Sequence, residues 1–121
     1  MDESQTIAVQ TEFDVFMARM QVRKLARAIG FDITNQARIA LATSSLARVL
    51  RLGEMHRGQV MIDHLDREEH SGLRVSCTAI VSSDFELGAR AFTDVKWLVD
   101  ELIVKELPSN DVQVTLIKWV V

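Results

Sequence analysis

The 121-residue chain contains one cysteine, one proline and five glycines, and only 6% of its residues are aromatic. The single cysteine, Cys77, excludes an internal disulfide and fits a reducing compartment. No apolar run approaches the roughly eighteen residues needed to span a bilayer, and the acidic N-terminus lacks the basic start of a signal peptide. We therefore expect a cytoplasmic protein that does not enter a membrane.

The glycines are also too scattered to form a phosphate-binding loop. Gly53 and Gly58 are close enough in the chain, but the Lys-Ser or Lys-Thr pair of a Walker loop does not follow them. No serine lies in a G-x-S-x-G turn, the strained elbow of many hydrolases. A net charge of −3 and few aromatic residues give little support to nucleic-acid binding.

Three histidines, His56, His64 and His70, lie close in sequence to several acidic residues. Zinc sites use spacings such as H-x₃-H on a helix or paired cysteines, and neither occurs here. The charged segment 66–71 is better explained as the solvated tip of a hairpin. We expect no metal site.

The residues that are present indicate one folded domain. The chain is 48% hydrophobic and 26% charged, without a Pro/Gly/Ser-rich linker. Its length suits a single domain over residues 6–121, preceded by a loose N-terminal segment at residues 1–5.

The patterning predicts both strands and helices. Alternating and β-branched residues predict strands over 6–10, 58–65, 72–79 and 112–119. Helical spacing predicts a helix from an N-cap at Asp14 to Ile29, closed by Gly30, a second from Asp32 or Thr34 towards Gly53, and a third over about 87–104. Helices gathered on one face of a mostly antiparallel sheet would form an α+β two-layer sandwich.

The segment 41–50, which reads LATSSLARVL, resembles the motif A-x-S-E-L-A-R-N. That motif belongs to the anti-sigma-factor and switch serine-kinase branch of the GHKL ATPases, the histidine-kinase-like family. Segment 12–31 resembles the family's first helix, 95–101 its helix V-K-R-L-M-D-E, and 112–119 its closing strand, which ends in K-W. The resemblance covers most of the chain and implies the family's ATPase fold.

The residues that the resemblance assigns to nucleotide chemistry have been replaced. Ser45 stands at the position of the family's catalytic Glu, and Val49 at that of its Mg²⁺-binding Asn, one turn further along the same helical face. Ala79 falls roughly at the adenine-reading Asp of the motif D-x-G-x-G, and only residues 82–89 occupy the place of the glycine-rich lid. Serine is a poor base and valine cannot ligate Mg²⁺. We therefore expect no catalytic residue and no binding of ATP or Mg²⁺. We also expect a version of the family's fold that lacks the ATP lid.

Arg19, Arg23 and Arg27 recur every four residues and form one stripe on the first helix. This stripe is either a solvated face or a docking surface.

The resemblance implies a non-catalytic regulatory module of bacterial stress or sporulation-type signalling. Its partner would be a STAS-domain antagonist, a sigma factor or a PP2C-type phosphatase. Two alternatives stay open: a divergent ATP-binding serine kinase in which Asp84 or Glu86 replaces the lost Glu, and a self-associating structural subunit, since relatives of this fold often form homodimers.

Overall fold

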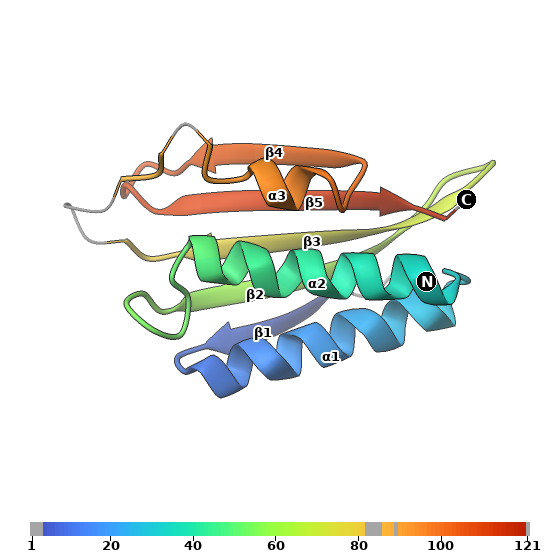
Figure 1. Cartoon of the computed structure of the whole chain (residues 1–121), viewed down its shortest axis with the longest axis horizontal. Helices are drawn as coiled ribbons and strands as arrows, with labels where there is room; N and C mark the ends of the chain where they lie inside the picture. The colour runs from blue at the N-terminus through green and yellow to red at the C-terminus, as the bar shows by residue number, and fades with distance from the viewer. Residues whose placement is uncertain (1–3, 82–85, 89, 121) are drawn as a thin grey trace.

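A computed structural model describes residues 4–81, 86–88 and 90–120 of the chain. Its elements are β1 (Gln5–Val9), α1 (Glu12–Ala28), α2 (Ile33–Val49), β2 (Gly58–Asp66), β3 (Ser71–Ala79), α3 (Thr93–Lys96), β4 (Glu101–Glu106) and β5 (Val112–Trp119). The five strands form one antiparallel sheet in the order β1-β2-β3-β5-β4. The two long helices lie antiparallel on one face of this sheet (Figure 1). The predicted α+β two-layer sandwich is confirmed.

Strand β1 begins at Gln5, which pairs with Ile62 of β2, so the sheet includes the last residue of the predicted N-terminal segment. Residues 1–3 of that segment lie outside the described part of the chain. Within the described residues, no helix is both long enough and apolar enough to cross a membrane.

Helix α1 begins at a capping box. Thr11 is the N-cap residue, and its Oγ1 accepts a hydrogen bond from the N–H of Asp14 at 3.4 Å. The Asp14 carboxylate accepts in turn from the N–H groups of Gln10 and Thr11, at 2.9 and 3.1 Å. These bonds, above all the one from Gln10, hold the pKa of Asp14 below its usual value. The prediction that Asp14 is itself the cap was therefore wrong, because Asp14 is the reciprocal partner in the box.

A short turn connects α1 to α2. Gly30 follows the C-cap residue Ile29 with a φ of 107°, a left-handed conformation that favours glycine. Asp32 then caps α2, since its carboxylate accepts a hydrogen bond from the N–H of Asn35 at 2.8 Å. The predicted helix-ending role of Gly30 and the predicted N-cap at Asp32 are both confirmed. Helix α2 ends at Val49, however, before Gly53.

The predicted third helix over 87–104 was wrong. Of the described residues in this segment, only Thr93–Lys96 are helical, and the chain then turns into β4. Segment 95–101, which resembles a family helix, is thus divided between the end of α3, a turn and the first residue of β4. Ile103 and Val104 are β-branched residues that suit a strand, and β4 pairs with β5 along its full length. Tertiary pairing has overridden the helical spacing.

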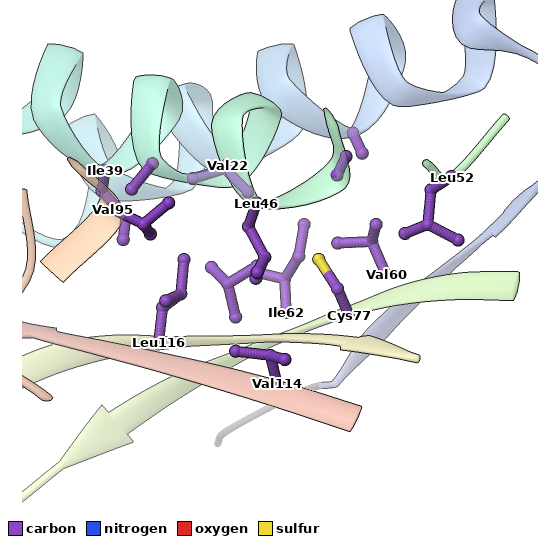
Figure 2. Packing of buried hydrophobic residues seen from close by; sticks show 14 of the residues in the cluster. Val22, Ile39, Leu46, Leu52, Val60, Ile62, Cys77, Val95, Val114 and Leu116 are labelled. Atoms are coloured by element: carbon purple, nitrogen blue, oxygen red, sulfur yellow. The ribbon is translucent and has the colours of Figure 1, made fainter. Parts of the chain in front are cut away.

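The core fills the space between the helix pair and the sheet (Figure 2). Helices α1 and α2 contribute Val22, Ile39 and Leu46, and the sheet contributes Ile62 and Leu116, all fully buried. Alternate residues of each central strand point to the helices, because successive side chains on a strand face opposite sides. The helix layer therefore seals one face of the sheet.

Polar side chains that bond across strands occupy the other face. Arg74 Nε donates to the Asp63 carboxylate at 3.2 Å, and Ser4 Oγ donates to the same carboxylate. The hydroxyls of Ser76 on β3 and Thr115 on β5 lie 3.0 Å apart. These bonds pair Asp63, Arg74, Ser76 and Thr115 on the face of the sheet that turns away from α1 and α2 (Figure 1).

Candidate functional site

Two of the three positions that the resemblance assigns to nucleotide chemistry lie together on α2. Ser45 and Val49 are one turn apart and both half-buried. The preceding residue, Ser44, faces α1, where its hydroxyl accepts a hydrogen bond from Arg19 Nη1 at 3.4 Å. Because successive residues of a helix are about 100° apart, Ser45 points away from α1. Ser45 and Val49 therefore share a side of α2 that does not serve the contact between the two helices.

The third position, Ala79, is the last residue of β3 and is fully buried in the core. It pairs with Gly58 on one side and with Val112 on the other. A methyl group there offers no acceptor for an adenine amino group. At the other two positions, a valine cannot ligate Mg²⁺ and a serine hydroxyl is a poor general base. The side chains of Ser45, Val49 and Ala79 thus differ in chemistry from those that the resemblance assigns to their positions.

The predicted position of the lid, residues 82–89, lies largely outside the described residues, which omit 82–85 and 89. Asp84, one of the two candidate replacement bases, is among the omitted residues. The other, Glu86, is exposed to solvent. On either side of the gap, Val81 and Leu87 are half-buried against the core.

The predicted arginine stripe is divided by the structure. Arg19 turns to α2 and bonds to Ser44. Arg23 and Arg27 instead line an open groove of about 550 Å³, together with Lys24. Two of the three predicted arginines thus belong to one concave surface, and Lys24 adds a third cation to it.

The remaining lining of this groove comes from both helices. Met20 of α1 and Ile33 of α2 give it apolar walls, and Gln36 of α2 also lines it. Gln36 is buried, and its Nε2 donates to the Phe31 carbonyl oxygen at 2.8 Å, which fixes the side chain. Among the residues that the structure describes, no acidic side chain lines the groove. We call this surface the basic groove.

An apolar patch on α1 adjoins the basic groove and was not found by sequence analysis. Phe13, Phe16, Met17 and Met20 are 66%, 54%, 44% and 52% exposed. Their spacing places them on one side of the helix, opposite the buried stripe that includes Val22. The available signal was the presence of two apolar stripes on one helix, since packing against a core needs only one.

The three histidines have different surroundings. His56 is buried, with Nδ1 2.9 Å from the Leu50 carbonyl oxygen. The ring of His70 lies edge-on to that of Trp119, with centroids 4.3 Å apart. Across residues 4–81, 86–88 and 90–120, no three His, Cys, Asp or Glu side chains are placed to hold a metal ion.

Cys77 lies on β3 and is fully buried in the core. This burial raises the pKa of its thiol to about 12. The thiol therefore stays protonated at neutral pH and packs as a small apolar group.

The chain is similar in sequence to a known protein kinase. The chain is 28% identical to the serine/threonine-protein kinase RsbT of Bacillus subtilis (strain 168), in an alignment that covers 98% of each chain. No family model matches the chain. A similarity that extends over nearly the full length supports a relationship to the RsbT and anti-sigma kinase family, as the motif on α2 had indicated.

Proposed function

We propose that this protein is a non-catalytic regulatory module that acts by binding another protein. One observation carries the proposal: the exposed side of α1 presents four large apolar side chains next to the basic groove. Large contiguous apolar patches on soluble monomers commonly mark binding sites. The positive charge beside the patch would then select among partners.

The residues at the substituted positions support the absence of catalysis. A phosphoryl-transfer site of the related kind needs a carboxylate to orient the attacking group and oxygen ligands for Mg²⁺. Ser45, Val49 and Ala79 offer no carboxylate and no amide. On this proposal the chain descends from a kinase, has lost phosphoryl transfer and has kept its docking surface.

The proposed partner is a STAS-domain antagonist, a sigma factor or a PP2C-type phosphatase of a bacterial stress or sporulation pathway. Phe13 and Phe16, whose ring centroids are 6.4 Å apart, would supply buried aromatic area. Arg23, Lys24 and Arg27 would meet an acidic rim on the partner. Apolar burial would then supply most of the affinity, and charge most of the selectivity.

A second function, ATP-dependent serine kinase activity, is favoured by one observation, the similarity to a protein that is itself a serine/threonine kinase. On this alternative, Asp84 or Glu86 would act as the base in place of Ser45. Nucleotide binding separates the two functions.

We expect ATP with Mg²⁺ to leave the melting temperature unchanged and to give no binding heat in isothermal titration. A ligand that binds only the native state raises stability by RT ln(1 + [L]/Kd), about 2.7 kcal/mol at a hundredfold excess over Kd. A shift of several degrees at millimolar ATP would instead support the kinase.

The double variant Ser45→Glu, Val49→Asn also tests whether the protein has lost the family's nucleotide pocket. It restores the two α2 side chains of the family motif and leaves Ala79 unchanged. We expect it to remain inactive towards a STAS-domain substrate, because no adenine-reading carboxylate has been restored. Phosphorylation of that substrate by the double variant would contradict the proposal that the whole pocket is lost.

Docking is tested by reversing one charge in the basic groove. We expect Arg23→Glu to raise the dissociation constant for a purified partner of the proposed classes by about tenfold, because a favourable contact becomes a repulsion. Binding by the variant should also depend less on salt, since screening acts on the attraction that has been removed.

Arg38→Glu is the matched control, because Arg38 is exposed on α2 and does not line the groove. It changes the net charge by the same amount. Equal losses of partner affinity for Arg23→Glu and Arg38→Glu would show that only net charge affects binding and that the basic groove is an ordinary solvated surface.

A further inference from the structure

In the part of the chain that the structure describes, strand β4 forms an edge of the sheet. It pairs with β5 on one side, and it is the last strand in the order β1-β2-β3-β5-β4. Its central residues Ile103 and Val104 are 52% and 46% exposed, although both are large and apolar. Exposed edge strands of this kind are templates for pairing with a further strand.

The register with β5 determines which backbone groups of β4 face the open side. Leu107 N–H donates to the Asp111 carbonyl oxygen at 2.8 Å, in line with the register that pairs Glu106 with Val112. In an antiparallel ladder, alternate residues bond to the same neighbour. Odd-numbered residues therefore bond to β5, so Leu102 and Val104 direct their N–H and C=O groups outward.

The sequence of β4 is complementary to itself when read antiparallel. If Ile103 of one copy faces Ile103 of a second copy, Glu101 of each copy faces Lys105 of the other. The same register places Leu102 opposite Val104, and these are the residues whose N–H and C=O groups point outward. Backbone bonding and side-chain charge thus select the same register. Ile103 would contact its own copy, and the Glu–Lys pairs would lie where facing side chains come closest.

We propose that β4 is a self-association edge, through which two copies of this chain join antiparallel into one continuous sheet. The complementary segment is short, because Glu106 would face Asp100 of the second copy, and both are acidic. The Asp100 carboxylate is held towards β5 by the N–H of Trp119, at 2.7 Å. The pairing therefore centres on residues 101–105.

This interface leaves the proposed docking surface free. Helix α1 lies over the β1 side of the sheet and β4 is the opposite edge, so a dimer through β4 exposes both copies of the apolar patch and the basic groove (Figure 1). The inference does not rest on the proposed function, since it concerns different residues.

Sedimentation of the full chain, from about 1 μM to about 1 mM, tests the interface over the range of moderate to weak association. We expect a concentration-dependent monomer–dimer equilibrium. Lys105→Glu should raise the dimer dissociation constant at least tenfold, because two attractive pairs become repulsive. The double variant Glu101→Lys, Lys105→Glu should bring the dimer dissociation constant back to within a few fold of the wild-type value, since the exchanged charges complement each other again. Arg67→Glu, on the exposed tip between β2 and β3, controls for net charge.

Each other outcome overturns the proposal. A wild-type chain that stays monomeric at the highest concentration has no such edge contact. A dimer that survives Lys105→Glu uses another surface. Failure of the double variant to restore a dimer rules out the register, provided that circular dichroism shows both variants folded. Loss of partner binding by Arg23→Glu would leave these results unchanged, so the two proposals fail separately.

Discussion

A Gly58→Ala variant is expected to lose about 3 kcal/mol or more of folding stability and to accumulate as unfolded or insoluble protein. A Cβ atom at position 58 would lie 1.8 Å from the carbonyl oxygen of Thr78 and 2.9 Å from Leu52 Cδ2. The Thr78 oxygen belongs to the backbone of β3, which pairs with β2 along its full length. It can move only if the two strands separate. Since domains are stable by about 5–15 kcal/mol, such a loss removes much of the total.

Gly88→Ala is the control for this prediction. A Cβ atom at Gly88 would meet no atom of the described residues within 4 Å, and we expect the stability of this variant to stay within about 0.5 kcal/mol of the wild type. Urea unfolding followed by circular dichroism measures both. Similar urea concentrations at the unfolding midpoint for the two variants would show that the β2–β3 pairing adjusts to a methyl group at position 58.

Leu46→Ala is expected to cost about 3–5 kcal/mol, because it leaves a cavity at the centre of the core as well as removing buried apolar area. Leu46 lies on the face of α2 that points at the sheet and is fully buried (Figure 2). Leu46 is adjacent to Ser45, so the same experiment measures how much the packing of α2 contributes to the stability of the fold.

Leu41→Ala is the matched control, because Leu41 lies on the same helix and is 43% exposed. The chemical change is identical and the helix gains slightly in propensity, so we expect a change within about 0.5 kcal/mol. Urea titration gives the free energies of unfolding of Leu46→Ala and Leu41→Ala for comparison. Equal losses at positions 41 and 46 would contradict the placement of α2 described above.

Local sequence signals predicted most of the fold. Gly30 and Asp32 fixed the turn between the helices, and the last strand was predicted as the structure has it, Val112–Trp119. The largest failure was the segment that follows α3. Its apolar residues fit a helix as well as a strand over a short window, and the decision came from β5, a partner that a local pattern does not contain.

The candidate site was predicted less completely than the fold. Sequence spacing identified Arg23 and Arg27, which line the basic groove, but it grouped them with Arg19, which bonds to Ser44. The apolar patch of α1 was missed because apolar residues on a helix are normally assigned to the core. Only the packed structure shows that Val22 and its neighbours already fill that role, so that Phe13 and Met20 are left exposed.

The position of β5 has a consequence for how the protein is made. This strand follows every other element in the chain, yet it lies inside the sheet, between β3 and β4. A chain still emerging from the ribosome can form the α1–α2 pair and the β2–β3 hairpin, both of which are local. It cannot join β4 to the rest of the sheet until residues 112–119 have left the exit tunnel. The sheet is therefore completed only after β5 has emerged, and until then the inner edge of β3 is open to chaperones and to neighbouring nascent chains.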